Sequence, residues 1–69
     1  MVASITIRFG KRVREHRLNR GISQERLGAI TDIDRTYIGM IERGERNITL
    51  PKAERIAKAL GVRLSALLD

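Results

Sequence analysis

The chain has 69 residues, and its 14 Lys and Arg against 8 Asp and Glu give a formal net charge of +6. This length predicts one small domain over residues 1–69, and the excess of positive charge favours an anionic partner, with nucleic acid the first candidate. Cysteine is absent and His16 is the only histidine, which excludes disulfides and argues against a bound metal.

The N-terminal stretch, residues 1–7, carries no charged side chain and is rich in β-branched residues, and no partner strand is evident elsewhere. We expect it to be a frayed arm, with Ser4 or Thr6 capping the helix that follows. That first helix is predicted from about Ile7 to Asn19, and Gly21 ends it.

One face of the first predicted helix carries Phe9, Val13 and Arg17 at four-residue spacing, which indicates an inward stripe. An Arg on such a stripe needs an anionic partner, and Glu42 is the candidate. His16 belongs at the edge of the stripe. The remaining basic residues either face DNA phosphates, contact anionic lipid or are simply solvated. They are Arg8, Lys11, Arg12, Arg14 and Arg20.

Residues 23–44, SQERLGAITDIDRTYIGMIERG, predict two short helices joined by a tight turn. Ser23 and Asp34 are N-cap residues, the first helix is about two turns long, and Gly44 stops the second. Asp32 in the turn can adopt a positive φ. The apolar residues of this helix-turn-helix candidate are expected to share one small core: Leu27, Ile30, Ile33, Ile38 and Ile41.

The outward positions of the second of these helices are left for a partner: Arg35, Thr36, Tyr37, Met40 and Arg43. An N-terminal Arg and Thr on such a helix reach base edges in a DNA major groove, where Arg pairs with guanine O6 and N7. Arg35 and Thr36 taken alone favour plain solvation, but the surrounding helix-turn-helix pattern favours DNA contact. Arg46 and Asn47 follow in a polar connection, where they bind phosphates, reach a base edge or form a plain loop.

The C-terminal third predicts two further helices. Thr49 caps the first of them, Pro51 is tolerated in its first turn and Gly61 ends it. Its apolar stripe consists of Leu50, Ala53, Ile56, Ala57 and Leu60. The tail, residues 62–69, is long enough for a short fifth helix with Val62, Leu64, Leu67 and Leu68. These four apolar residues are too many for one small core, so we expect some of them to form a dimer surface. The alternative is that they pack back onto the domain.

Four segments carry a family resemblance: RGISQE at residues 20–25, Leu27, IERG at residues 41–44 and AKALGV at residues 57–62. Together with the order of the elements, they resemble the Xre or Cro/repressor family of helix-turn-helix regulators across nearly the whole chain. Within that family, DRTYIGMIERGERNITL looks most like the controller proteins of restriction-modification systems, which are small dimeric transcription regulators.

The resemblance implies an all-α, compact five-helix domain whose third helix, about residues 34–43, enters the major groove. It also implies roles for single residues, by their match to the family pattern. Bases are contacted by Arg35, Thr36 and Met40. The DNA backbone is contacted by Gln24, Tyr37, Arg43, Arg46 and Asn47. The buried ion pair of the family falls on Arg17 and Glu42, in agreement with the spacing argument.

The chain departs from the family pattern at several positions. Gly28 stands where relatives often carry Ala, Asp32 where the turn often has Gly, and Arg63 where Ser or Thr often caps the fifth helix. Gly39, inside the third helix, costs about 1 kcal/mol relative to Ala, and its missing side chain would let the helix lie closer to DNA.

The leading hypothesis is a sequence-specific regulator that binds duplex DNA as a homodimer on a two-fold symmetric operator. RNA polymerase is a further candidate partner, through an exposed acidic residue such as Glu25, Glu45 or Glu54. An antitoxin that binds a partner protein and regulates its own transcription is the alternative. Enzymatic activity is not expected, because the sequence shows no paired nucleophile and base, no phosphate-binding loop and no metal-ligand spacing. A cofactor or a small-molecule ligand is not expected either.

Hydrophobic and aromatic content restrict the remaining choices. No apolar run approaches the ~20 residues that cross a bilayer, and no signal peptide is evident, so a cytoplasmic protein without a membrane partner is expected. One Tyr and one Phe are too few to bind single strands by base stacking, which favours duplex DNA.

Overall fold

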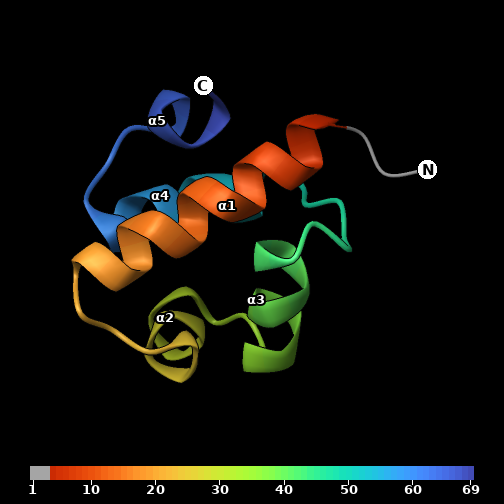
Figure 1. The fold of residues 1–69 in the computed structure, drawn as a ribbon. Helices are drawn as coiled ribbons and strands as arrows, with labels where there is room; N and C mark the ends of the chain where they lie inside the picture. The colour runs from red at the N-terminus through yellow and green to blue at the C-terminus, as the bar shows by residue number, and fades with distance from the viewer. Residues whose placement is uncertain (1–3) are drawn as a thin grey trace.

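The computed structural model describes residues 4–69, which form five helices and, within that range, no strand. The helices are α1 (Ser4–Asn19), α2 (Gln24–Thr31), α3 (Arg35–Glu42), α4 (Leu50–Leu60) and α5 (Leu64–Leu68). In Figure 1, α1 crosses the middle of the molecule, with α5 above it, α4 behind it and α2 and α3 below it. This arrangement confirms the predicted all-α fold of five helices.

The first helix begins at Ser4, three residues earlier than predicted. Residues 4–7 are helical, so neither Ser4 nor Thr6 is a cap ahead of the helix. The prediction of a frayed arm is therefore wrong for these four residues. The Thr6 hydroxyl instead donates a hydrogen bond to Oδ1 of Asn47 at 2.9 Å. Such a tertiary contact offsets the slightly lower helix propensity of β-branched residues. The rest of the predicted arm, residues 1–3, lies outside the described residues.

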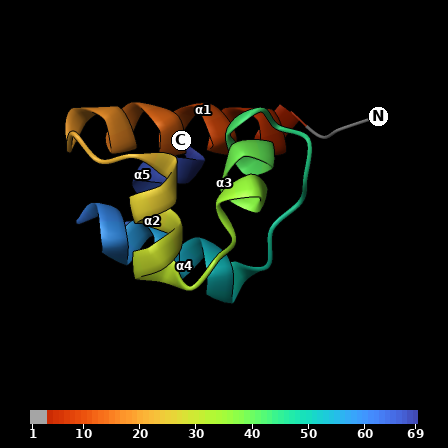
Figure 2. The same ribbon diagram turned by 90° about the horizontal axis from the view of Figure 1, so that it is seen from below.

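The turn between α2 and α3 has the predicted chemistry. Oγ of Ser23 accepts a hydrogen bond from the Arg26 backbone N–H at 2.9 Å, so it caps α2. Asp34 caps α3 in the same way, and Asp32 has a φ of 59°, as expected for this turn. Packing explains why position 28 is a glycine, because a Cβ built there would lie 2.5 Å from the Ile33 carbonyl oxygen. Figure 2 shows α2 and α3 next to each other, joined by this short connection.

The core contains most of the predicted residues, but Ile30 is an exception. Leu27, Ile33, Ile38 and Ile41 are buried, whereas Ile30 is 49% exposed, so its assignment to the core is wrong. On the inward face of α2, Leu27 is followed by Thr31, four positions later, and not by Ile30, three positions later. Thr31 is buried, and its hydroxyl donates to the Leu27 carbonyl oxygen at 2.7 Å, which satisfies its polar atom.

In the C-terminal helices, the predicted positions of Leu50 and Leu67 are wrong. Oγ1 of Thr49 caps α4 as predicted, and Ala53, Ile56, Ala57 and Leu60 are buried. Leu50 is 71% exposed, because the first residue of α4 extends beyond the core. Leu67 is completely buried within the chain, so its place on a dimer surface is wrong. Val62, Leu64 and Leu68 pack against the core but keep part of their surface exposed.

Two contacts with backbone atoms of other helices fix the position of α1. A Cβ at Gly10 would collide with the carbonyl oxygen of Ile41, so α1 and α3 pack backbone against backbone there. At the other side of α1, Nε of Arg8 donates to the Leu68 carbonyl oxygen at 3.0 Å. The position of α3 relative to the rest of the domain therefore depends on a glycine that sequence periodicity does not single out.

Candidate nucleic-acid interface

A buried ion pair joins α1 to α3 beneath the surface that carries the helix-turn-helix. Nε of Arg17 lies 2.7 Å from Oε2 of Glu42, and Nη2 donates to Oε1 at 3.1 Å, so the pair is bidentate. The side chains are only 8% and 2% exposed. Nη1 of Arg17 also donates to the Ile22 carbonyl oxygen at 3.0 Å. This geometry confirms the predicted partnership, and it satisfies both buried charges.

Gln24 connects this buried pair to the surface. It is the first residue of α2, and its side-chain nitrogen donates to Oε1 of Glu42 at 3.1 Å. The same carboxylate oxygen therefore accepts from Arg17 and from Gln24. Since an amide nitrogen carries two N–H donors, this hydrogen bond orients Gln24 and leaves a second donor for a ligand.

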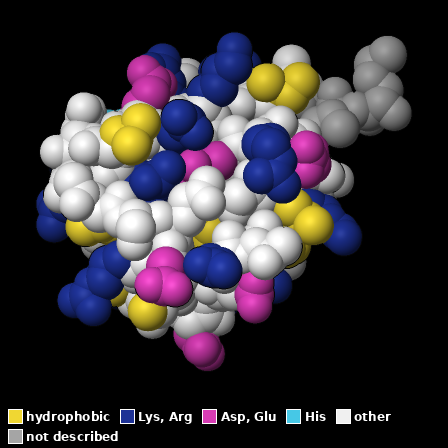
Figure 3. All heavy atoms as spheres, turned by 60° about the horizontal axis from the view of Figure 1, so that its bottom comes forward, with side chains coloured by type: hydrophobic (Ala, Val, Ile, Leu, Met, Phe, Trp, Pro, Cys, Tyr) yellow, Lys and Arg dark blue, Asp and Glu magenta, His cyan; other side chains and the backbone are white. Residues whose placement is uncertain are grey.

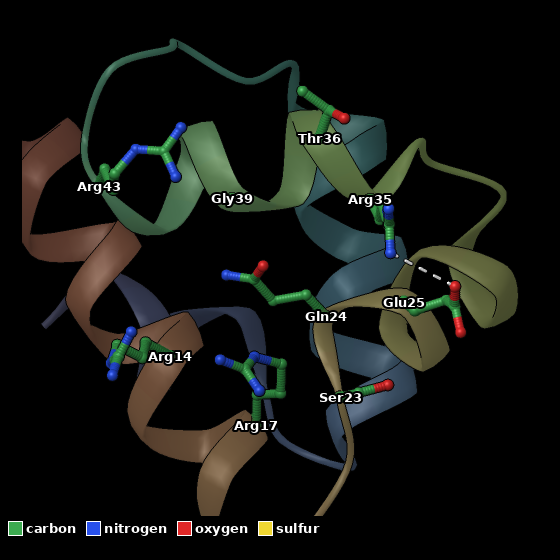
Figure 4. Close-up of a pocket in the computed structure, with 9 residues that line it drawn as sticks. All are labelled: Arg14, Arg17, Ser23, Gln24, Glu25, Arg35, Thr36, Gly39 and Arg43. Carbon is green, nitrogen blue, oxygen red and sulfur yellow. Dashed lines mark ion pairs between the residues drawn. The ribbon is translucent and has the colours of Figure 1, made fainter.

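Above the pair, α1, α2 and α3 enclose an open groove of about 720 Å³ (Figure 4). Its walls are polar, and four of their five charged side chains are arginines. They are formed by Arg14, Arg17, Ser23, Gln24, Glu25, Arg35, Thr36, Gly39 and Arg43. Five of the residues singled out from the sequence, namely Arg17, Gln24, Arg35, Thr36 and Arg43, are thus brought to one place.

Two exposed ion pairs involve arginines of this groove. Nη1 of Arg35 lies 3.5 Å from Oε2 of Glu25, with side chains 69% and 77% exposed. Nε of Arg43 donates to Oε2 of Glu45 at 3.0 Å. This hydrogen bond, followed by Coulombic attraction to Glu45, raises the pKa of Arg43 above its ordinary value. Acidic side chains beside the arginines are visible on this face in Figure 3.

The loop after α3 is held by contacts that the sequence did not indicate. The Tyr37 hydroxyl donates to the Asn47 carbonyl oxygen at 2.9 Å, and the Asn47 side chain accepts from Thr6. Nζ of Lys52 lies 5.1 Å from the centroid of the Tyr37 ring, a cation–π contact. Arg46 is exposed in the same loop. Tyr37 and Asn47 lie 10 positions apart in the chain, and Thr6 and Asn47 lie 41 positions apart. Helical spacing therefore gave no indication of these contacts.

The basic residues of α1 do not form a single surface. Arg14 lines the groove, whereas Arg8 and Arg12 donate to the carbonyl oxygens of Leu68 and Asp69 at 3.0 and 3.1 Å. Among the exposed basic residues of α1, Arg14 is therefore the one that lines the groove beside the helix-turn-helix, next to the buried Arg17. Met40 is half-buried on α3.

Within residues 4–69, no three His, Asp or Glu side chains come together where they would hold a metal ion. No helix in this range has both the length and the apolar character needed to cross a membrane.

A capped helix pair that presents Arg35 and Thr36 on an exposed helix, beside a positively charged groove, defines a DNA-binding helix-turn-helix protein. Comparison with known proteins agrees. The sequence profile of the helix-turn-helix family HTH_3 matches residues 13–67. The chain belongs to this family, and it is a transcription regulator of the Xre type.

Several of the similar proteins are control proteins, including controllers of restriction-modification systems. The chain is 49% identical to the control protein C.BamHI of Bacillus amyloliquefaciens over 70 residues, covering 100% of this chain and 86% of that protein. It is 44% identical to the control protein C.MunI of a Mycoplasma species, covering 91% and 86% of the two chains. The crystal structure of the restriction-modification controller protein C.AhdI from Aeromonas hydrophila superposes with a TM-score of 0.89 at 38% identity, covering 94% and 98%.

Proposed function

We propose that this protein reads a specific sequence in duplex DNA and thereby controls transcription of a restriction-modification system. α3 enters the major groove, where Arg35, Thr36 and Met40 face base edges. The observation that carries the proposal is the exposure of Arg35 and Thr36 at the start of a helix whose opposite face, Ile38 and Ile41, is anchored in the core. A helix held in this way presents its outer side chains at a fixed angle to the DNA.

Residues on both sides of α3 position the protein on the DNA backbone. Gln24 and Arg43 come from the groove, and Tyr37, Arg46 and Asn47 come from the other side. Because the Tyr37 hydroxyl already binds the Asn47 carbonyl oxygen, the loop that carries Arg46 is ordered before DNA arrives. Ordering in advance lowers the entropy cost of binding.

The regulator acts as a homodimer in this proposal. Val62, Leu64 and Leu68 retain exposed apolar surface, and Leu68 lines a hollow of about 240 Å³ together with Ile5 and Leu50. A second copy that covers this surface, including the exposed Leu50, places two α3 helices for half-sites about 34 Å apart.

The place of action follows from this function: a regulator of promoters works in the cytoplasm, beside RNA polymerase. Three exposed acidic residues are candidates for contact with the polymerase, namely Glu25, Glu45 and Glu54. Glu25 and Glu45 are paired with arginines, and Glu25 lines the DNA-facing groove. Glu54 is exposed on α4, outside that groove, and is the candidate that remains accessible on DNA.

The test of DNA recognition is a selection of random duplex DNA by the purified protein at fixed, near-physiological salt, followed by sequencing. Salt is fixed because phosphate contacts alone give some affinity for any duplex. We expect enrichment of a two-fold symmetric motif with half-sites about one helical turn apart. Retention without an enriched motif would contradict the proposal and favour non-specific binding or an antitoxin.

The test of the dimer is sedimentation of the variant Leu50→Glu. We expect this charge to dissociate the dimer while the fold persists, since Leu50 is mostly exposed in the single chain. Leu18→Glu is the matched control, because Leu18 is also an exposed leucine but does not line the hollow. A Leu50→Glu variant that sediments like the wild type would place the dimer surface elsewhere.

A further inference from the structure

The loop between α3 and α4, residues 43–49, is held by the first turn of α1 at two points. A Cβ at Gly44, which has a φ of 74°, would lie 3.1 Å from Cα of Ile7, so the start of the loop packs directly on α1. Further along the loop, the Thr6 hydroxyl donates to Oδ1 of Asn47 at 2.9 Å. Figures 1 and 2 both show the loop passing beside the N-terminal end of α1. The first turn of α1 therefore helps to determine where the loop lies.

The backbone and the side chain of Asn47 are held by different partners. Its carbonyl oxygen accepts a hydrogen bond from the Tyr37 hydroxyl at 2.9 Å, which fixes the backbone. Its side-chain oxygen accepts from Thr6, which restricts rotation of the side chain. The Asn47 side chain is nevertheless exposed, so a ligand can reach it. Asn47 is thus held in one orientation at the surface before any ligand binds.

The hydrogen bond from Thr6 also decides which end of the Asn47 amide meets a ligand. A hydroxyl has one O–H donor, and here it is given to the amide oxygen. The amide nitrogen carries two N–H donors and no acceptor. An unrestrained asparagine offers both a donor and an acceptor, and it uses both when it pairs with N6 and N7 of adenine. With its oxygen directed at Thr6, Asn47 offers a ligand only donors.

We infer that Thr6 is a positioning residue for DNA recognition, because it holds Asn47 as a hydrogen-bond donor toward acceptor atoms of DNA. The inference rests on the proposed contact between Asn47 and DNA, and it assigns the chemistry of that contact. Acceptors of this kind are phosphate oxygens and the acceptor atoms of base edges, such as O6 and N7 of guanine. The paired contact with N6 and N7 of adenine is excluded, since it needs the amide oxygen as well.

The test is a double-mutant cycle between positions 6 and 47 of the full-length protein. Thr6→Val removes the hydroxyl and keeps a β-branched side chain of similar shape. Fluorescence anisotropy at fixed salt measures affinity for the operator selected from random DNA and for a random-sequence duplex. We expect Thr6→Val to weaken operator binding about fivefold, the size of one net hydrogen bond. In the Asn47→Ala background, Thr6→Val should cause no further loss, because Thr6 acts through Asn47.

Thr6→Ser is the matched control, because it keeps the O–H donor and should restore binding to within about twofold of the wild type. The melting temperature of Thr6→Val should stay within about 4 °C of the wild type, since the hydrogen bond joins side chains at the surface. An equal loss of affinity with and without Asn47, together with a clearly lower melting temperature, would assign Thr6 to the stability of α1 and overturn the inference. Unchanged affinity of Thr6→Val would overturn it as well.

Asn47→Asp tests which end of the amide meets DNA. The carboxylate still accepts the hydrogen bond from Thr6, so the melting temperature should not change, but it has no donor for DNA. We expect its affinity for DNA to fall at least as far as that of Asn47→Ala. Affinity equal to that of the wild type would show that the amide nitrogen is not the contact, and the inference would be wrong.

The two duplexes distinguish the two kinds of acceptor. Equal losses for Thr6→Val on the operator and on the random-sequence duplex would assign a phosphate oxygen. A loss confined to the operator would assign a base edge. Both results support the donor role of Asn47. Failure of the proposed function is a different result, since it appears as no enriched motif for the wild type.

Discussion

The groove between α1, α2 and α3 contains arginine and carboxylate pairs of two kinds. The pair of Arg17 and Glu42 is bidentate and almost completely buried, whereas the pair of Arg35 and Glu25 is a single contact of 3.5 Å between mostly exposed side chains. The chemistry is the same, but the solvent around it differs. A buried charge that loses its partner stays without solvation, because water cannot reach it. An exposed charge that loses its partner is solvated by water.

This difference separates the residues that maintain the fold from those that we propose to meet DNA. Arg17 cannot leave Glu42 without destabilising the domain, so it holds α1, α3 and Gln24 in place. Arg35 loses little by exchanging Glu25 for a base or a phosphate. Substitutions in the two pairs should therefore change different measured quantities.

The largest effect is expected for Glu42→Ala, which leaves the Arg17 charge buried without its partner. The free energy of unfolding should fall by about 3–5 kcal/mol, measured by urea denaturation. The double variant Arg17→Met and Glu42→Leu is the control, because it removes both charges and should recover much of the loss. A decrease as small as that of a surface pair would contradict the structural role of this pair.

An intermediate effect is expected for Arg35→Ala. Its binding to the selected operator should weaken by about 1–3 kcal/mol and lose preference at one base pair, because a base contact is removed. The free energy of unfolding should stay within about 0.5 kcal/mol of the wild type, since Arg35 is exposed. Repeating the DNA selection measures the preference. Equal losses on operator and random DNA would show that Arg35 is not a base reader.

The smallest effect is expected for Glu25→Gln. The free energy of unfolding should change by less than about 1 kcal/mol, as for other exposed pairs. Affinity for every duplex should rise, because the carboxylate that competes with DNA for Arg35 is gone and one negative charge leaves the groove. Anisotropy with random duplex measures the rise. Glu54→Gln, on the far helix α4, is the control, and a weaker binding of Glu25→Gln would mean that Glu25 assists Arg35 on DNA.

Local features of the chain predicted much of this molecule. Ser23, Asp34 and Thr49 cap helices because their side chains reach backbone N–H groups two or three residues away. The stripe of Phe9, Val13 and Arg17 was evident from helical spacing. These interactions depend on neighbours in the sequence or on one helix face, so the amino-acid order alone contains the information.

Contacts between distant segments could not be predicted in this way. The choice of Thr31 over Ile30 for the core depends on where α2 meets its neighbours, and the exposure of Leu50 depends on where the core ends. Direct backbone contact at Gly10 and the loop held by Thr6 and Tyr37 join segments far apart in the chain.

The candidate site, too, was predictable only in part from the sequence. The types of residue that we propose to face DNA, such as Arg35 and Thr36 at a helix start, were evident from the helix-turn-helix pattern. Their surroundings were not: the pairing of Arg35 with Glu25, the turn of Arg43 toward Gly39 and the placement of Arg14 beside them required the packed helices. Periodicity assigns a residue to a face of its own helix, but only the packing of α1, α2 and α3 decides which faces meet and what lies between them.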